Sequence, residues 1–334
     1  MTTTRDHHAE PGDYRRVGRR ELLRLWGPAV LAGAVLAGSG AALHGRPGRH
    51  QRPSGDDGPP PPPDWQAAGD IAARLAVAGG NGPVANLQRA LAAVGGIERF
   101  VGRGHRVAIK PNCAWDRSPE QAANTNPELV GELARLCLAA GAASVVVVDN
   151  SCHDPVRSFA RSGIAAAARA AGATVAHQGN SATERRDLGG LTLGTWEVLR
   201  PIVEADRLIN VPIVKHHSLS GATLGMKNWF GAVVGARPNL HQQIARVCAE
   251  LGAAFAPTLT VMDATRVLAG GGPTGGSLSL VKPLDLVGVA TDPVAAEAWG
   301  ASLLDLAPDR LPHLAIAQQL GLGSADWRSL VAEV

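Results

Sequence analysis

The stretch from residue 211 to residue 231 gathers the side chains best suited to chemistry. It contains Lys215, His216, His217, Lys227 and Asn228, separated by small residues and glycines. The chain has only four lysines against 28 arginines, so a retained lysine indicates a place where a compact ammonium group with an adjustable pKa is useful. Biased codon usage would also leave few lysines, and this explanation stays open, above all for Lys282.

Two kinds of chemistry suit these side chains. Histidine titrates near neutral pH, so His217 is a candidate for proton transfer. Lys215 and Lys227, beside Asn228, are candidates for holding a carboxylate or a phosphate. A plainer interpretation is that both lysines form salt bridges with carboxylates elsewhere in the chain, Asp149 or Asp263.

The adjacent histidines have a structural alternative as well, since either could cap the loop by hydrogen bonding. Neighbouring residues in a strand point to opposite faces, so at most one of His216 and His217 reaches a shared site.

Nitrogen and oxygen donors in this chain also suit a zinc, iron or nickel ion. The candidate metal ligands are His216 and His241, with carboxylates nearby. The four cysteines, at positions 113, 137, 152 and 248, form no CxxC pair, so a zinc ribbon or ferredoxin-type cluster motif is absent. Cys113 and Cys152 each follow a predicted strand, where a thiolate would need a lysine or histidine close by.

The elements that must position these residues alternate between strand and helix patterns. Strands are predicted at residues 106–110, 144–149, 174–177, 207–211, 258–263 and 284–290, and helices at 127–140, 157–171, 240–251, 293–304 and 312–320. Repeated βα units predict an α/β fold with a mostly parallel sheet and helices on both faces. The fold is either one compact unit or two closely packed Rossmann-like lobes.

Polar residues follow the carboxyl ends of five predicted strands. Ligands of such sheets gather beyond those ends, so we expect these side chains to line one cleft. Separate solvated loops are the alternative. The residues concerned are Lys110, Asn112, Asp149, Lys215, His217, Lys227, Asn228, Asp263 and Asp292.

The order of short motifs resembles that of the DUF362 family, in its twin-arginine-exported branch. The resemblance runs from about residue 107 to about residue 299, and the family name itself records an unassigned function. In that branch a pair of cysteines often follows the strand ending at Asp149, and here only Cys152 is present. The motifs are Lys110-Pro-Asn112, Asn124-Thr-Asn-Pro127, Asn210-Val-Pro-Ile-Val-Lys-His-His217, Leu224-Gly-Met-Lys-Asn228, His241, Val261-Met-Asp-Ala264, Gly272-Pro-Thr-Gly-Gly276 and Thr291-Asp-Pro293.

A fainter resemblance links residues 217–241 to the nickel-dependent lactate racemase family. His217-Ser-Leu-Ser-Gly221 followed by Gly225-Met-Lys227 is similar to segments of that family, with a further histidine, His241, at a comparable interval. The resemblance implies that His217 acts as acid and base, that Lys227 anchors a nickel pincer nucleotide covalently, and that His241 ligates nickel. A remote shared fold without the shared cofactor is the alternative.

The first 63 residues are typical of an export leader. A basic segment containing Arg19 and Arg20 precedes an apolar run at residues 25–43, and a Pro- and Gly-rich segment follows. This pattern predicts a twin-arginine signal at residues 1–44, a linker at 45–63 and an α/β domain at 64–334. A short membrane anchor is the alternative reading of the apolar run.

The charge balance limits the partners of the chain. The leader and linker hold nine arginines and six acidic residues, so the remaining domain has 23 basic and 23 acidic groups. A formally neutral domain supports neither nucleic-acid binding nor an anionic-membrane patch. The neutral charge of the domain leads us to expect membrane contact through the leader alone. The leader pattern itself predicts the twin-arginine machinery as a partner and an extracytoplasmic location.

Two functional classes remain. One is an exported enzyme that binds a small anionic ligand, with or without a metal cofactor. The other is a non-catalytic exported accessory protein that holds a metal, a cluster or a ligand.

Overall fold

The computed structural model describes residues 58–66 and 74–334. The predicted twin-arginine segment, including Arg19 and Arg20, and most of the predicted linker lie outside the described residues. The described residues all belong to one compact unit. Among them, no helix combines the length and the apolar character needed to cross a membrane.

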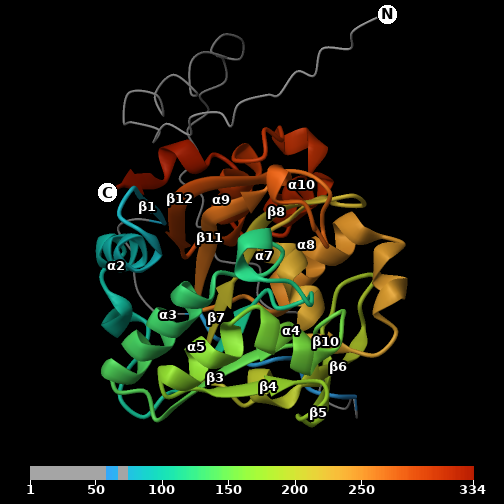
Figure 1. Ribbon diagram of the computed structural model, residues 1–334. Coiled ribbons are helices and arrows are strands. Elements are labelled where there is room, and N and C mark those ends of the chain that lie inside the picture. The colour runs from blue at the N-terminus through green and yellow to red at the C-terminus, as the bar shows by residue number, and fades with distance from the viewer. Residues whose placement is uncertain (1–57, 67–73) are drawn as a thin grey trace, which may run out of the picture. The chain divides into compact units, whose positions relative to one another are not determined.

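A large mixed sheet forms the centre of the described part (Figure 1). Five strands, β11, β7, β2, β3 and β4, run parallel, and β12 pairs antiparallel with both β1 and β11. The strand order is β13 (Val331–Glu333), β1 (Leu75–Gly79), β12 (Val281–Ala290), β11 (Leu259–Leu268), β7 (Arg207–Val211), β2 (Arg106–Pro111), β3 (Ser144–Asp149) and β4 (Thr174–His177).

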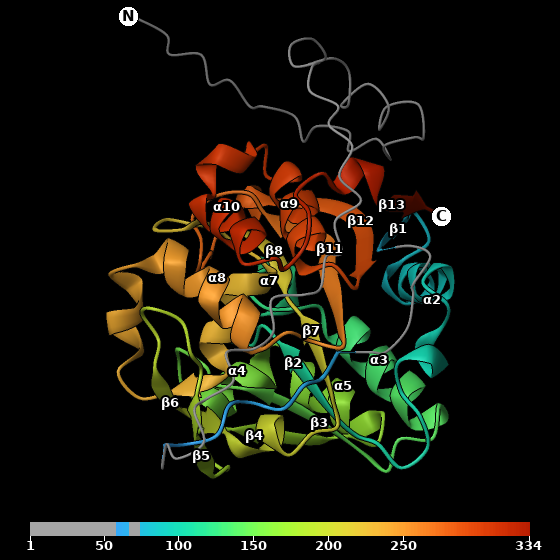
Figure 2. The same ribbon diagram turned by 180° about the vertical axis from the view of Figure 1, so that it is seen from behind.

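Helices cover both faces of this sheet. Alternate residues of β2 enter different apolar clusters, with Ala108 in one and Val107 and Ile109 in the other. The cluster of Val107 includes residues of α2 (Pro83–Ala93), α3 (Pro127–Ala139), α4 (Pro155–Arg161) and α5 (Ile164–Ala170). That of Ala108 includes residues of α6 (Arg200–Val203), α7 (Gly225–Asn228), α8 (Ile244–Ala254), α9 (Pro293–Ser302) and α10 (Pro312–Gln319). Seen from behind, α8, α9 and α10 lie beside one another (Figure 2).

Short elements complete the described structure. A hairpin of β8 (Ile213–His217) and β9 (Gly221–Thr223) joins the large sheet through β11, and β10 (Val233–Val234), β6 (Thr195–Leu199) and β5 (Thr183–Asp187) form a small second sheet. The 3-10 helices are η1 (Ile97–Arg99), η2 (Pro119–Gln121), η3 (Trp229–Gly231), η4 (Arg237–His241), η5 (Leu278–Leu280), η6 (Pro308–Arg310) and η7 (Trp327–Ser329).

Helix starts follow from local chemistry. The Asn126 side chain accepts a hydrogen bond from the Glu128 N–H at the start of α3, and Asp154 accepts one from Arg157 N–H at the start of α4. Proline occupies the first turn of both helices, where its missing N–H and fixed φ cost nothing.

The α/β fold with a mostly parallel sheet is confirmed, with differences of detail. The helix predicted at 157–171 is two helices, α4 and α5, because Gly163 adopts φ +76° between them. The strand predicted at 284–290 begins earlier, at Val281, and runs antiparallel to its neighbours. Both β1 and α2 lie in a segment for which no element was predicted.

Candidate functional site

A cavity of about 390 Å³ opens where β2 and β3 end and where the β8–β9 hairpin and α7 come together. It brings together eight of the candidate residues, which come from five different elements or their adjoining loops. They are Lys110, Asn112, Asp149, Lys215, His217, Lys227, Asn228 and His241. We call this space the lysine cavity.

Strand alternation decides which residues of the hairpin reach the lysine cavity. Lys215 and His217 are two positions apart in β8, so they share a face, and both line the cavity. His216 lies on the opposite face, where its Nδ1 accepts a hydrogen bond from the Gly272 N–H at 3.2 Å. Of the two adjacent histidines, His217 lines the cavity and His216 does not, and the metal-ligand assignment of His216 has no support in this geometry.

A chain of amide side chains fixes the position of Lys215. Asn210 Nδ2 donates to the Gly225 carbonyl, and Asn210 Oδ1 accepts from Asn228 Nδ2 at 2.8 Å. Asn228 Oδ1 in turn accepts from Asn112 Nδ2 at 3.0 Å. These hydrogen bonds fix which end of each amide group is the oxygen and which is the nitrogen. Asn112 Oδ1 is therefore free to accept a hydrogen bond from Lys215 Nζ at 3.0 Å.

Lys215 has no carboxylate partner in the described part of the chain. Its ammonium group donates to Asn112 Oδ1 and to the Ala123 carbonyl, and its side chain is 1% exposed. Burial lowers the pKa of Lys215 to about 7. The neighbouring charges that act on it are Asp149 and Cys152, which oppose the shift, and Lys227 and Lys110, which add to it.

Within the described part of the chain, Lys110 pairs with a carboxylate, which Lys215 and Lys227 do not. Its Nζ lies 2.7 Å from Asp149 Oδ1, and both side chains are buried. It also donates to the Pro111 carbonyl and to Asn228 Oδ1, which ties the ion pair to the amide chain. Asp149 Oδ2 accepts a hydrogen bond from the Cys113 N–H at 2.6 Å. Apart from the ion pair with Lys110, Asp149 Oδ1 has no hydrogen-bond partner among the described residues. Burial lowers the pKa of Lys110, and the Asp149 charge partly offsets that effect.

Lys227 faces an aromatic ring rather than an acid. Its Nζ lies 3.3 Å from the centroid of the Phe230 ring, a cation–π contact, and no hydrogen bond or ion pair to it occurs within the residues that the structure describes. The side chain is 7% exposed, and burial lowers its pKa to about 8. Its ammonium group is therefore positioned toward the lysine cavity with unused donors.

His217 presents a defined face to the cavity. Its Nδ1 accepts from the Leu219 N–H at 3.1 Å and from the Ser220 N–H at 3.3 Å. Burial, followed by the charges of Lys227 and Lys215, lowers the pKa of His217 to about 3. The ring is thus neutral near pH 7, and because Nδ1 is an acceptor the proton lies on Nε2. His217 can donate a hydrogen bond, but it is a weak base in the unliganded protein.

Two predicted ligand-binding carboxylates lie outside the lysine cavity. Asp263 is fully buried and accepts hydrogen bonds from the Asn126 N–H and from the N–H and hydroxyl of Thr265. Asp292 caps α9 by accepting from the Val294 and Ala295 N–H groups. Asp263 is held by donors from a distant segment and from Thr265, and Asp292 by the first turn of its own helix, so neither lines the lysine cavity, contrary to expectation.

The donor set does not fit a metal ion held by the protein alone. Within residues 58–66 and 74–334, no three His, Cys, Asp or Glu side chains come together in a way that could hold one. His241 does line the lysine cavity, where it contacts the Phe230 ring at 5.2 Å between centroids, and burial and Lys227 lower its pKa.

Arg237 belongs to the site although the sequence did not predict it. Arg237 lines the cavity and donates to the carbonyls of Asn150, Phe230 and Ser151. Nothing in the sequence distinguishes this arginine from the 27 others. Cys152 lines the cavity and is exposed, whereas Cys113 is buried and burial raises the pKa of its thiol. Trp115 also lines the cavity, whereas Trp229 packs in the core against Phe255.

Three comparisons with known proteins bear on this geometry. A curated relative, the thylakoid-associated protein sll1697 of Synechocystis sp., is 28% identical over 250 residues, which cover 72% of this chain and 75% of that protein. A solved structure, the lactate racemase apoprotein from Thermoanaerobacterium thermosaccharolyticum, is similar with a TM-score of 0.40 and 13% identity, over 70% of this chain and 57% of its own. The model of the DUF362 family, described as a domain of unknown function, matches residues 107–302. That match includes the amide chain, Asn210, Asn228 and Asn112, together with Lys110, Lys215 and Lys227, and this chain belongs to the DUF362 family.

Proposed function

We propose that the lysine cavity binds a small anionic ligand carrying a carboxylate or a phosphate, and that the protein is an enzyme acting on that ligand. One observation carries the proposal. The cavity wall contains Lys110, Lys215, Lys227 and Arg237 but a single acidic residue, Asp149, which is paired with Lys110. Buried charges without partners are costly, and an anion would relieve that cost.

The amide chain makes this excess of charge a stable feature. Lys215 is anchored by two acceptors and Lys227 by the Phe230 ring, so neither can turn out to solvent without losing these contacts. A bound anion accepts hydrogen bonds from the unused donors of both lysines. Their pKa values then rise, because an opposite charge favours the ammonium form.

The chemistry proposed for the site follows from the protonation states. His217 donates its Nε2–H to the ligand, a role that suits polarisation of a carbonyl or stabilisation of an oxyanion. Lys215, whose pKa is lowered to about 7, exchanges protons readily near neutral pH. We therefore assign proton transfer to Lys215, hydrogen-bond donation to His217, ligand binding to Lys227, Lys110, Asn112 and Asn228, and charge balance to Asp149.

Export is a separate part of the proposal. The paired Arg19 and Arg20 and the apolar run after them support translocation of the folded domain by the twin-arginine route. A cavity whose polar walls come from distant segments must be assembled by folding, which agrees with a route that carries folded proteins.

Cys152 allows a direct test of anion binding. It is the one exposed cysteine of the four and it lines the lysine cavity, so it should report on reagents that enter. Iodoacetate and iodoacetamide alkylate thiols in the same way but differ in charge. The quantity measured is the rate constant for iodoacetate divided by that for iodoacetamide. This ratio should be about tenfold or more higher at Cys152 than for free glutathione, because clefts of one charge sign concentrate oppositely charged reagents.

Matched lysine variants complete this test. Lys227→Gln should lower the rate ratio, while Lys282→Gln, at an exposed position, should leave it unchanged. Inorganic phosphate should protect Cys152 from iodoacetate in the parent protein. A rate ratio equal to that of glutathione, unaffected by Lys227→Gln or by phosphate, would contradict anion binding in this cavity.

A further inference from the structure

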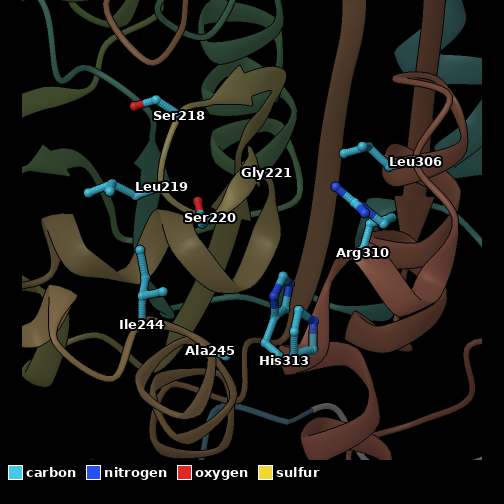
Figure 3. A pocket seen from close by; sticks show the side chains of 10 residues that line it. Ser218, Leu219, Ser220, Gly221, Ile244, Ala245, Leu306, Arg310 and His313 are labelled. Carbon is cyan, nitrogen blue, oxygen red and sulfur yellow. The ribbon is translucent and has the colours of Figure 1, made fainter.

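A second cavity, of about 400 Å³, lies beside the turn that joins β8 to β9. Figure 3 shows the side chains of its wall, with Ser218 and Leu219 of the turn on one side of the view and Leu306 and Arg310 on the other. The cavity is bounded further by the start of α8 and by the start of α10, through Ile244 and His313. Ser218 and Leu219 line both this space and the lysine cavity, so one turn borders the two cavities.

The second cavity carries a positive charge that has no acidic partner among the described residues. Arg310 lies in η6 and is exposed, and in the described part of the chain its guanidinium group takes part in no ion pair or hydrogen bond. No acidic side chain belongs to the cavity wall. A guanidinium group offers several parallel N–H donors, which match a carboxylate or sulfonate.

The remaining wall is largely apolar. Leu219 is 67% exposed, and Ile244, Leu306 and Pro312 contribute further hydrocarbon surface. Covering such surface is favourable in proportion to the apolar area removed from water. A complementary ligand therefore combines one negative group with an apolar body.

Two contacts connect this second cavity to the lysine cavity. The turn holds His217 through the N–H groups of Leu219 and Ser220. On the other side, His313 Nε2 lies 2.8 Å from Glu297 Oε1, and Glu297 Oε2 accepts from the N–H of Met226, the neighbour of Lys227. Both His313 and Glu297 are buried, so the path between the cavities is formed by fixed groups.

We propose that the second cavity is a binding site for an organic anion with an apolar body, an aromatic or aliphatic carboxylate or sulfonate whose charge pairs with Arg310. The occupant lies against the outer side of the turn that orients His217. Binding here does not depend on the function proposed for the lysine cavity.

The probe for this site is 8-anilino-1-naphthalenesulfonate, which has an aromatic body and one sulfonate and fluoresces when it is removed from water. We expect one molecule to bind per full-length chain. Arg310→Gln should weaken binding about tenfold, as loss of a hydrogen bond to a charged group does, and Arg310→Glu should weaken it more. Arg169→Gln, at an exposed position of α5, should leave it unchanged.

One further variant separates the two cavities. Lys227→Gln should leave binding of the naphthalenesulfonate unchanged, because that lysine belongs to the other cavity. If Lys227→Gln removes binding and the Arg310 variants do not, the probe occupies the lysine cavity, and the second site is refuted while the first is supported. Absence of binding to the parent protein, or equal binding by all variants, also refutes the second site. Cooperative thermal unfolding of every variant excludes binding to a partly unfolded state, for which this dye is known.

Discussion

Lys110 Nζ lies 2.7 Å from Asp149 Oδ1, although the two residues are 39 positions apart in the chain. They face each other because β2 and β3 are parallel neighbours that end at the same edge of the sheet. Among the described residues, Asp149 is the only acid that lines the lysine cavity, and it is paired with Lys110. Lys215 and Lys227 therefore have no carboxylate partner there and are available to a ligand.

Removing the charge of Asp149 should be costly. Asp149→Asn keeps an oxygen for the Cys113 N–H but leaves the Lys110 ammonium buried without an acid, so we expect a loss of about 3–5 kcal/mol in the free energy of unfolding. Combining it with Lys110→Met should recover much of that loss. Urea titrations of the parent, the two single variants and the double variant measure the coupling. Additive losses would mean that the two side chains do not form a pair.

Beside the Lys110–Asp149 ion pair, we expect position 231 to accept only glycine without a loss of stability. A Cβ atom at this position would lie 1.9 Å from Asp149 Oδ1 and 2.8 Å from Lys110 Nζ. Gly231→Ala should therefore reduce stability by about 1–3 kcal/mol and weaken phosphate binding. Gly102→Ala is the matched control, since its Cβ would meet nothing closer than 3.5 Å. Chemical denaturation and calorimetry measure the two effects. An unchanged phosphate affinity in Gly231→Ala would indicate that the pair plays no part in the site.

The fold and most of the lysine cavity could be predicted from the sequence because they depend on local patterns. The β-branched run of β3 and the polar residues at strand ends placed Lys110 and Asp149 at one sheet edge. Alternation along β8 predicted that His216 and His217 would separate. These inferences need only the periodicity of a strand and the direction of a parallel sheet.

Other features depend on contacts between distant segments. Asp263 follows the same strand-end rule as Asp149, yet the Asn126 N–H and Thr265 take up its oxygens. Arg237 reaches the site through three backbone carbonyls, a geometry that no sequence spacing encodes. The antiparallel pairing of β12 was missed because its apolar run does not reveal the direction of the strand.

The lowered pKa of Lys215 predicts how stability depends on pH. The folded chain releases this proton near pH 7, while the unfolded chain keeps it up to the ordinary value of 10.5. Between these values only the unfolded state binds the proton, so stability should rise with pH. Lys215→Gln should flatten this rise, and Lys282→Gln should not. Unfolding free energies at pH 7, 8, 9 and 10 provide the check. A parallel profile for Lys215→Gln and the parent would mean that Lys215 stays charged throughout.

Export by the twin-arginine route predicts a sharp response to a conservative change. Replacing Arg19 and Arg20 together by lysine preserves the charge of the leader but removes the paired guanidinium groups. The protein should then remain in the cytoplasm of its host, as cell fractionation and immunoblotting would reveal. Undiminished translocation of the double variant would rule out this route.

The central claim is that Lys215 and Lys227 bind an anion, and the scarcity of lysine makes it directly measurable. In protein labelled with ¹³C-lysine, only four Cε signals arise, and single Lys→Gln variants assign them. At pH 7.5, addition of phosphate or oxalate should move the Lys215 and Lys227 signals toward the ammonium position, because the anion raises both pKa values, while Lys282 stays unchanged. If the Lys215 and Lys227 signals remain in place with both anions, or move no more than that of Lys282, the lysine cavity is not an anion site.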